Sequence, residues 1–480
     1  MKIKSDFLKS GAVYTILGFL PTASRFFLFP FFLHYLSPED FALISLNTMV
    51  ASILPAFITL GLETSMNRFY FDFFKYPKIE KAFLSTLTLS IIGLSLLIGI
   101  LFIAVGPMLF HISFKTPRFT FYPFGVTALL TAMPGGLYAL YLNYLRCRKA
   151  LRNYVILNLS LFLLTSLGEI VGIVFLKLHV EQLVWIKPLI TWPIVILSTI
   201  LLLYQTGIHF EKRLLRIALS YSTPLLPHLV FGMVFVYTDR LMIENNLNLT
   251  YLAIYNLTMA ISNVIDIFEQ ALRNATFPNV YKMLKENVYA NVLPISRIHT
   301  INGLILTAIM AVIVFSTPIG VFYLLKEVYH PLIYLIPFAL IISVVRFYYL
   351  MYVEPLFFFK KIKEVSTSTF IQGCFAIVFN FLLIPRFGLY GALVANILSK
   401  AVQVGFIYYV SINIKIFQYK VSFILKCMMS LILMMVVISF VTKNLLDNRI
   451  LIYLIDCIPL IFVGFSVLYF FRKDKQLRTA

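Results

Sequence analysis

Charged side chains stand inside several apolar, helix-length segments of this 480-residue sequence. The first is Arg25, near the middle of the apolar run 11–36, between Pro21 and Pro30. A guanidinium at the centre of a bilayer costs at least about 2.5 to 3.5 kcal/mol, so Arg25 must face protein or a water-filled cavity. Because guanidinium groups bind phosphate through paired, charge-assisted hydrogen bonds, we expect Arg25 to hold an anionic group in such a cavity. The alternative is a structural ion pair with a neighbouring helix.

Three further residues are candidates to line the same cavity. Arg346 and Lys400 lie in apolar runs near 331–353 and 389–412, and His228 follows Pro227 in the run 217–238. Ionisable groups within membrane segments usually have a function, so we assign Arg346 and Lys400 to ligand binding. For His228, a hydrogen-bonded histidine of the helix core is the alternative.

Two acidic residues share one helix face with a basic residue. Asp266, Glu269 and Arg273 are spaced i, i+3 and i+7, so their side chains lie on one side of a helix. We expect Asp266 and Glu269 to form a cytoplasmic gate, or to couple transport to H+ or Na+. A solvated helix end near the following loop is the equally weighted alternative.

Three more charged residues are candidates for gating or ion coupling. Glu169 lies in the small-residue stretch LTSLGEIVG, which favours close helix packing. A structural pair with Arg25 or Arg346 is its alternative role. Asp239 and Arg240 lie at the end of the run 217–238, and we expect them to form part of an outer gate.

The elements that carry these residues are membrane-spanning helices. The chain is 60% hydrophobic and 12% charged, with a mean hydropathy of +0.91, which predicts an all-α polytopic membrane protein. Fourteen apolar runs, given below, are joined by connections that we number in chain order. Of the 40 Lys and Arg residues, 27 fall in the N-terminus, the even-numbered connections and the C-terminus, and only 9 in the odd-numbered connections. This asymmetry predicts cytoplasmic N- and C-termini. It also indicates that the net charge of +20 serves contact with anionic membrane headgroups rather than binding of nucleic acid. Fourteen apolar runs of spanning length occur, at about 11–36, 40–62, 82–110, 120–145, 153–176, 182–205, 217–238, 250–272, 298–325, 331–353, 365–384, 389–412, 421–442 and 450–471.

A weak internal repeat divides these runs into two halves. The dipeptide Leu-Pro at 20–21 recurs at 226–227, and FALISL at 41–46 is echoed by LAIYNL at 252–257. Six spans separate the copies, so both halves have the same orientation in the membrane. We therefore expect six-helix lobes at 1–210 and 211–418, followed by two additional helices and a tail at 419–480.

The sequence lacks the common motifs for nucleotide, metal and hydrolase chemistry. There is no GxxxxGK[ST], HExxH, CxxC or GxSxG pattern and no EF-hand loop, so we expect neither an enzyme nor a bound cofactor or metal. The four cysteines are scattered without paired spacing, which indicates no disulfide framework and no zinc site. An ion gradient, or removal of the product, must then give transport its direction.

Three stretches resemble one transporter family. Residues 380–399 (NFLLIPRFGLYGALVANILS), the pair STPLLP at 222–227 with TDRLMI at 238–243, and the segment from LSPEDF at 36–41 to LGLE at 60–63 are similar to Wzx-type polysaccharide flippases. That family belongs to the multidrug/oligosaccharidyl-lipid/polysaccharide (MOP) superfamily. The resemblance implies two six-helix lobes in a V around a central cavity lined in part by the first and seventh spans.

The resemblance also implies a function and partners. An undecaprenyl-pyrophosphate-linked oligosaccharide would move from the inner to the outer leaflet of the bacterial cytoplasmic (inner) membrane by alternating access. The product would enter surface polysaccharide such as O-antigen, the outer part of lipopolysaccharide, or capsule, with a polymerase and a chain-length regulator as further partners. The alternatives are a multidrug or cation exporter of the same superfamily and, less favoured, a polysaccharide polymerase or ligase.

Overall fold

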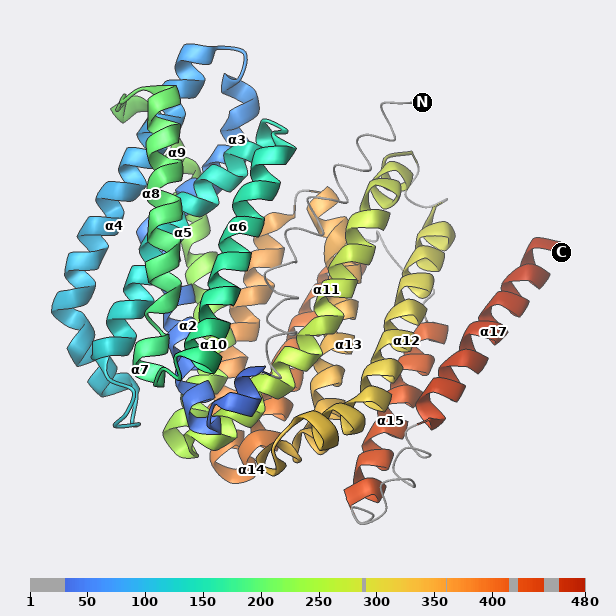
Figure 1. The fold of residues 1–480 in the computed structure, drawn as a ribbon. Helices are drawn as coiled ribbons and strands as arrows, with labels where there is room; N and C mark the ends of the chain where they lie inside the picture. The colour runs from blue at the N-terminus through green and yellow to red at the C-terminus, as the bar shows by residue number, and fades with distance from the viewer. Residues whose placement is uncertain (1–30, 287–290, 360, 414–421, 444–456, 480) are drawn as a thin grey trace. The chain divides into compact units, whose positions relative to one another are not determined.

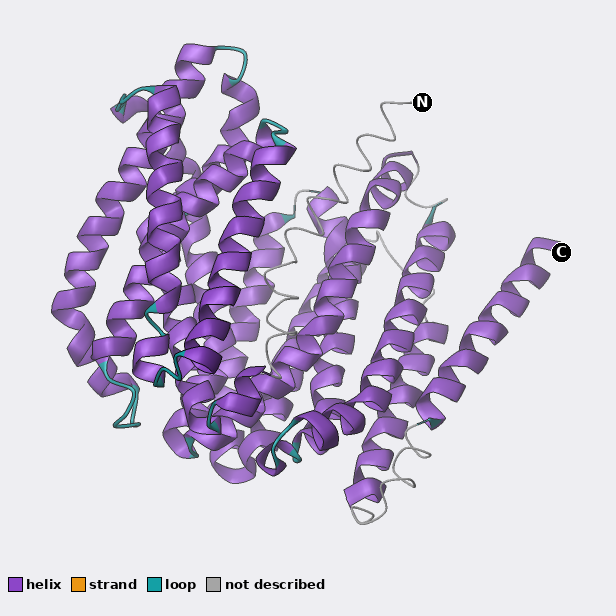
Figure 2. Ribbon diagram, in the orientation of Figure 1, coloured by secondary structure: helices purple, strands orange, loops and turns teal. Residues whose placement is uncertain are grey.

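A computed structural model describes residues 31–286, 291–359, 361–413, 422–443 and 457–479. This part of the chain is helical, with short connections and no strand (Figure 2). The principal helices are α2 (Pro38–Thr59), α3 (Leu62–Phe73), α4 (Pro77–Ser113), α5 (Val126–Cys147), α6 (Leu151–Ile170), α7 (Val180–Leu183), α8 (Ile186–Thr206), α9 (Lys212–Ser222), α10 (Leu226–Asn246), α11 (Leu249–Glu286), α12 (Val292–Leu324), α13 (Leu332–Phe358), α14 (Ile362–Asn413), α15 (Ser422–Lys443) and α17 (Ile458–Thr479) (Figure 1).

The described helices confirm the predicted all-α, multi-span class. Nine segments in the described ranges are long and apolar enough to cross a membrane. The last of them, Lys363–Ile412, contains both the eleventh and the twelfth predicted spans, and the thirteenth and fourteenth correspond to shorter apolar helices. The seventh predicted span corresponds to α10, and most of the first lies outside the described residues.

Contacts group the chain into two compact units, Met1–Thr250 (unit 1) and Tyr251–Ala480 (unit 2). The boundary falls where α10 gives way to α11. The predicted lobe limits at 210 and 418 concern an internal duplication, which compactness does not test, and they stay a prediction.

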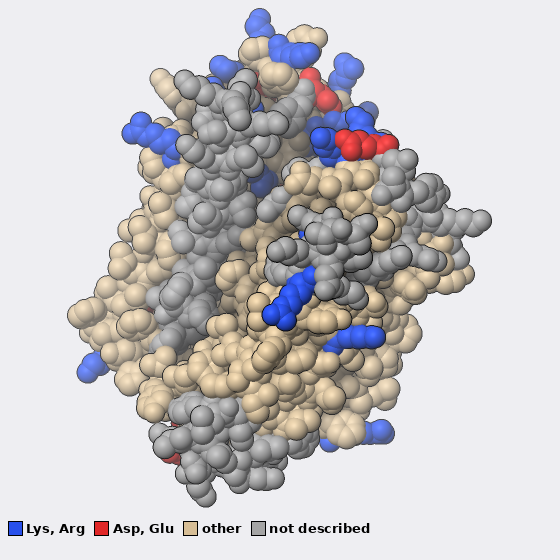
Figure 3. Space-filling view, turned by 90° about the vertical axis from the view of Figure 1, so that its right-hand side faces the viewer, with Lys and Arg blue, Asp and Glu red and all other residues tan. Residues whose placement is uncertain are grey.

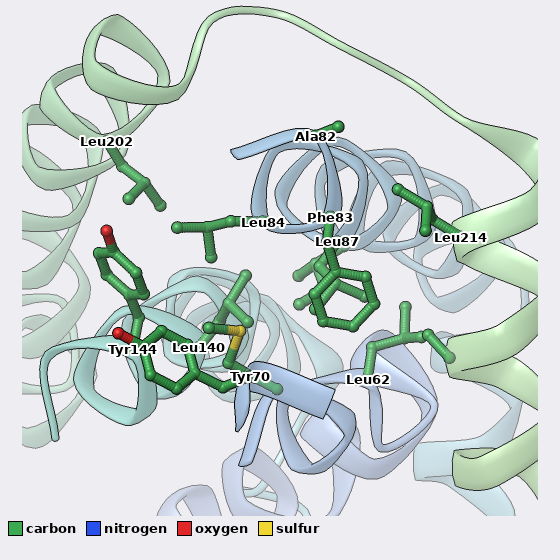
Figure 4. Packing of buried hydrophobic residues seen from close by; sticks show 13 residues of the cluster. Leu62, Tyr70, Ala82, Phe83, Leu84, Leu87, Leu140, Tyr144, Leu202 and Leu214 are labelled. Carbon is green, nitrogen blue, oxygen red and sulfur yellow. The ribbon is translucent and has the colours of Figure 1, made fainter. Parts of the chain in front are cut away.

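The core of unit 1 is an apolar cluster contributed by α3, α4, α5, α8 and α9 (Figure 4). Phe83 and Leu87 of α4 are almost fully buried between Leu62 of α3 and Leu140 of α5. Leu214 of α9 closes the cluster. Burying one such side chain stabilises the fold by about 1.5 to 3 kcal/mol. This cluster therefore holds the ends of five helices together.

Two short helices, α3 and α9, adjoin the predicted spans of unit 1. Helix α3 follows the second predicted span, and its Met66 and Tyr70 are buried in the cluster. Gly61 lies between α2 and α3. Its φ of 70° is in the left-handed region, which glycine adopts more readily than other residues. The seventh span was predicted to begin at 217, but α9 occupies 212–222 and α10 begins only at Leu226.

Unit 2 is built around α13, many of whose side chains are buried. Helix α14 packs along α13, while α12, α15 and α17 pack against one another beside it (Figure 1). Within α14, Gly388 has φ 57° and ψ −132°, and a Cβ on Gly391 would lie 2.2 Å from the Leu383 carbonyl oxygen. Residues eight apart in a straight helix are about 12 Å apart, so α14 turns sharply here. The turn separates the two spans predicted at 365–384 and 389–412.

The visible surface fits a membrane protein. On the face that carries α12, α15 and α17, tan residues cover most of the described area, and Lys and Arg gather mainly toward its upper end, with a few midway and at the lower edge (Figure 3). A largely uncharged surface of this kind suits hydrocarbon, because charged groups are expensive there.

Candidate ion-pair site in unit 2

A row of polar contacts joins α11 to α13. At its start, the Ser262 hydroxyl donates to the Ala339 carbonyl oxygen at 2.9 Å and lies 3.1 Å from the Ser343 hydroxyl. Ion pairs continue the row through Arg346 and end at Glu354. The partners rise together along both helices, so α11 and α13 run parallel. We call this row the α11–α13 seam.

Arg346 is the centre of the seam. Its guanidinium pairs with Asp266 through one terminal nitrogen, and its Nε lies 3.5 Å from Glu269 Oε2. The side chain of Glu269 is only 5% exposed, whereas Arg346 is 31% and Asp266 22% exposed. One guanidinium therefore holds two carboxylates, one of them buried, at the depth of an apolar span.

A second ion pair ends the seam. Arg273 Nε lies 3.7 Å from Glu354 Oε1, and the Glu354 side chain is 5% exposed. Tyr281, about two turns beyond the apolar part of α11, packs its ring against Phe358. Burial first, and then the negative charge of Glu354, raises the pKa of Tyr281, while Arg273 opposes the shift.

A small cavity lies between the two ion pairs and α12. It has room for about 20 Å³, and polar groups of Glu269, Arg273, Glu354, His299 and Asn302 line it. This is space for about one water molecule. Neither carboxylate oxygen of Glu269 has a hydrogen bond within the protein, so a bound water or proton in this cavity would meet an under-satisfied acceptor.

Lys400 of α14 brings a third positive charge to the seam. It acts electrostatically on both Asp266 and Glu269. The formal charges of the site then balance, with Arg346, Arg273 and Lys400 facing Asp266, Glu269 and Glu354. Such a set can exchange partners: a competing anion would displace carboxylates from the cations, and a proton would release them. Within the described ranges, no three His, Cys, Asp or Glu residues are grouped to hold a metal ion.

The structure brings four of the predicted site residues together. Arg346, Lys400, Asp266 and Glu269 were predicted as two sets, one binding ligand and the other gating or coupling. They form one cluster in unit 2, in which each cation interacts with both acids. Ligand binding and gating, if these residues perform them, therefore use the same groups.

Asp239 and Arg240 lie elsewhere, on α10 of unit 1. Arg240 Nη1 is 3.2 Å from Asp239 Oδ1, and its guanidinium carbon lies 5.3 Å from the centre of the Tyr237 ring. The Tyr237 hydroxyl in turn accepts a hydrogen bond from Ser52 of α2 at 2.8 Å. The Ser52–Tyr237 hydrogen bond ties α10 to α2. The outer-gate role of Asp239 and Arg240 stays a prediction.

Of the remaining predicted residues, the structure describes only the side chain of Glu169. Glu169 lies on α6 of unit 1 and is partly exposed. Arg25 is outside the described residues, and so is the His228 side chain. Their assignments to the cavity stay predictions.

Three residues of the seam were not predicted from the sequence: Ser262, Ser343 and Glu354. A signal for them exists: Ser262, Asp266, Glu269 and Arg273 are spaced by 4, 3 and 4 residues in an otherwise apolar helix. That spacing marks a polar stripe on one face. Only the facing helix shows which residues complete the stripe.

Unit 1 has an ionic cluster of its own. Arg118 lies between α4 and α5, and its guanidinium pairs with Asp40 at 2.8 Å, Glu181 at 3.4 Å and Glu39 at 3.5 Å. Desolvation would lower the pKa of Arg118, but the hydrogen bonds and charges of Asp40 and Glu181 raise it. We call these four residues the Arg118 cluster. It ties the start of α2 to α7.

The fold defines the class of protein first. It is similar to the lipid II flippase MurJ in its inward closed conformation, at 13% identity and a TM-score of 0.74, over 96% of this chain and 99% of MurJ. It is also similar to the eukaryotic MATE transporter AtDTX14, at 11% identity and a TM-score of 0.60, over 84% and 95% of the two chains. A MOP superfamily transporter from Pyrococcus furiosus matches at 13% identity and a TM-score of 0.56, over 85% and 96%. The chain therefore has the fold of the MOP superfamily.

The sequence then defines the family. Residues 34–291 match the model of the family described as "Polysaccharide biosynthesis protein". Because this match covers more than half of the chain, the chain belongs to that family. No curated protein sequence matches it.

Proposed function

We propose that this protein is a flippase that moves a lipid-linked oligosaccharide across a membrane without chemistry of its own. The observation that carries the proposal is the similarity to MurJ over nearly the whole of both chains, together with membership in a polysaccharide biosynthesis family. MurJ is a flippase for a lipid-linked substrate. The two findings have one function in common, the supply of a lipid-linked sugar for polysaccharide assembly.

We propose an undecaprenyl-pyrophosphate-linked repeat unit as the substrate, for O-antigen or capsule. Its hydroxyl groups and pyrophosphate cannot cross hydrocarbon unaided, whereas its lipid tail is already soluble there. Only the head needs a polar path. The setting would be the bacterial cytoplasmic membrane, with both termini in the cytoplasm, and a polymerase would consume the product. The excess of basic residues in alternate connections supports this orientation.

We assign substrate binding to Arg25, Arg346, Lys400 and His228, and gating or coupling to Asp266 and Glu269. In the seam, Arg346 is occupied by Asp266 and Glu269. A pyrophosphate offers more charge than a carboxylate and accepts paired hydrogen bonds from a guanidinium. Substrate and carboxylates would therefore compete for Arg346, and this competition would link arrival of the anionic head to opening of the seam.

Of the two predicted coupling ions, we favour H+ over Na+ at Glu269. The cavity beside Glu269 has room for about one water, and the Arg273 side chain lines the same cavity. A sodium ion there would face a guanidinium, whereas a proton would neutralise the carboxylate in place. Protonation would release Arg346 from one of its two partners.

Reconstitution tests the proposed function. Proteoliposomes containing the purified protein and a fluorescent undecaprenyl-pyrophosphate oligosaccharide should expose that sugar to an added glycosidase faster than protein-free liposomes do. An imposed H+ gradient should change the rate and an Na+ gradient should not. Equal exposure in protein-free liposomes would refute the flippase proposal.

Variants separate the assigned residues. Arg25→Ala and Arg346→Gln should each abolish flipping, and Arg118→Gln should not, because Arg118 belongs to a separate cluster in unit 1. Glu269→Gln should keep flipping but lose its response to the H+ gradient. Full surface polysaccharide with Arg25→Ala at normal protein level would remove Arg25 from the site.

A second candidate is an exporter of drugs or organic cations. The similarity to the MATE transporter AtDTX14 over 84% of this chain favours it, and the MOP superfamily transporter from Pyrococcus furiosus matches over 85%. Their TM-scores of 0.56 to 0.60 are lower than the 0.74 for MurJ, and the family match concerns polysaccharides. Strong export of a cationic dye from cells, with no flipping in liposomes, would decide for this candidate.

A further inference from the structure

Unit 1 contains a large cavity that the proposed transport does not use. It has a volume of about 770 Å³, within the range of about 300 to 1,000 Å³ typical of ligand pockets. Five helices contribute to it at one end of the unit: the last residues of α3, the first turn of α4, the end of α5, the start of α6 and the end of α8. We call it the unit 1 end pocket.

The pocket has an aromatic wall and two cations. Tyr70, Tyr141 and Tyr144 line it together with Phe74. Tyr70 and Tyr144 meet edge to face, with ring centres 6.3 Å apart. Figure 4 shows their hydroxyl oxygens on the same side of the apolar cluster to which both rings belong. These hydroxyl groups can donate hydrogen bonds to an anionic oxygen.

Arg148 is held in place at this wall. Its Nη1 donates to the Tyr144 hydroxyl at 3.0 Å, and its guanidinium carbon lies 5.8 Å from the centre of that ring. The side chain otherwise remains exposed, so most of its donors are available to a ligand. Lys81, at the start of α4, is also exposed and lines the same pocket.

One carboxylate shares the pocket with these two cations. Glu80 lines the pocket and interacts electrostatically with both Arg148 and Lys81. The charge of the lining is then two positive and one negative. Amide and hydroxyl groups of Asn153, Gln205 and Thr206 add neutral hydrogen-bonding partners. Such a lining fits an anion that carries hydroxyl groups.

The pocket lies where the apolar segments end. The lining residues come from the connection before the apolar run 82–110, from the ends of the runs 120–145 and 182–205 and the residues after them, and from the start of the run 153–176. All these ends adjoin even-numbered connections, which are rich in Lys and Arg. In the orientation proposed above, with these connections in the cytoplasm, the nearest abundant anions are the phosphate groups of lipids in the cytoplasmic leaflet.

We propose that the unit 1 end pocket binds the phosphate ester of an anionic, hydroxyl-bearing lipid headgroup. The phosphate contacts Arg148 and Lys81, and the rest of the headgroup contacts the tyrosines and the neutral polar side chains. The site is separate from the α11–α13 seam. It does not depend on the proposed flippase activity, so either proposal can fail alone.

The test measures binding of short-chain phosphatidylglycerol to the full-length protein in a neutral detergent. Arg148→Gln should weaken binding about tenfold, the size expected for one charge-assisted hydrogen bond. Lys81→Gln should weaken it several-fold. Glu80→Gln should strengthen it several-fold, because the acid that competes with the phosphate is removed. A purely structural role of these residues would not produce opposite signs.

The matched control is Arg152→Gln, which removes one exposed positive charge from the start of α6 without touching the pocket. It should leave the affinity within about twofold of the wild type. Thermal unfolding of each variant without lipid shows whether the fold is retained, and Lys81→Gln and Glu80→Gln keep the test decisive if Arg148→Gln fails to fold. Equal losses for Arg152→Gln and Lys81→Gln would overturn the proposal in favour of general surface attraction.

Two further probes identify the source of the phosphate. Short-chain phosphatidylcholine, whose choline neutralises the phosphate, should bind at least several-fold more weakly than phosphatidylglycerol. Glycerol phosphate without acyl chains should also bind more weakly, because it lacks contact with the detergent phase. Equal or tighter binding of glycerol phosphate would assign the pocket to a soluble phosphate ester and overturn the lipid assignment.

Discussion

The Arg118 cluster of unit 1 and the Arg346 pairs of unit 2 have the same composition and different surroundings. Each has one guanidinium facing two or more carboxylates. Arg118 is 46% exposed and two of its partners are more than 40% exposed. Arg346 is 31% exposed, and its partner Glu269 is only 5% exposed.

Burial, rather than the number of ion pairs, therefore sets the free energy that is lost when a pair in each cluster breaks. An exposed pair is solvated with or without its partner, so it contributes about 0 to 1 kcal/mol. A buried carboxylate that loses its cation cannot recover the lost interaction from water, so breaking such a pair costs about 3 to 5 kcal/mol. The Arg118 cluster is therefore a tether between helices, and the Arg346 pairs can act as a two-state element.

The largest effect should come from Arg346→Gln. It leaves Glu269 buried without its ion-pair partner, and we expect a loss of about 3 kcal/mol in stability, at the low end for buried pairs because Arg346 is partly exposed. Thermal unfolding of the purified protein in detergent measures it. A loss below that of Arg118→Gln would show that the two clusters do not differ as their burial indicates.

Arg346→Lys should have a smaller effect, about 1 to 2 kcal/mol. Lysine keeps the charge but lacks the planar fork that reaches Asp266 and Glu269 together. The matched change Arg118→Lys should have no measurable effect on unfolding, because water replaces the lost contacts. If both lysine variants unfold like the wild type, charge alone accounts for the Arg346 pairs.

Glu354→Gln tests the end of the seam. The amide keeps the size of the side chain, and Arg273, which is 29% exposed, can turn toward water. We therefore expect a loss of about 1 kcal/mol, the scale of one hydrogen bond. The double variant Arg273→Gln, Glu354→Gln should lose little more than the single one. A much larger loss in the double variant would show that the two residues act independently.

The smallest effect should come from Arg118→Gln, at most about 1 kcal/mol at low salt. Raising the salt concentration should remove that difference, because screening acts on exposed pairs, whereas the Arg346→Gln difference should persist. Melting temperatures at low and high salt measure both. A salt-independent loss for Arg118→Gln would mean that this cluster is less hydrated than its exposure indicates.

The sequence predicted the helical part of the fold well. Long apolar runs and the distribution of Lys and Arg depend only on local composition, and nearly every predicted span that falls in the described residues coincides with a helix. One boundary error has a local cause: α10 begins late because residues 222–227 contain two prolines.

The candidate site was predicted only in part. Asp266, Glu269 and Arg273 could be placed on one face of α11 from their spacing, since helical geometry repeats along the chain. Their partners could not be predicted, because Arg346 and Glu354 lie about 80 residues away on α13. The unit 1 end pocket was not predicted at all, since five helix ends must converge to form it.

The sequence by itself determined that this chain is a helical membrane protein, where most spans begin and end, and which charges lie within them. Hydrophobic periodicity and loop charge are properties of adjacent residues, so they need no knowledge of the fold. Only the tertiary structure decided that Arg346 faces two acids at once, that α13 supplies Glu354, and that Arg148 and Lys81 share a pocket. These contacts depend on which helices pack together, and the free energy of that packing is shared among many distant residues.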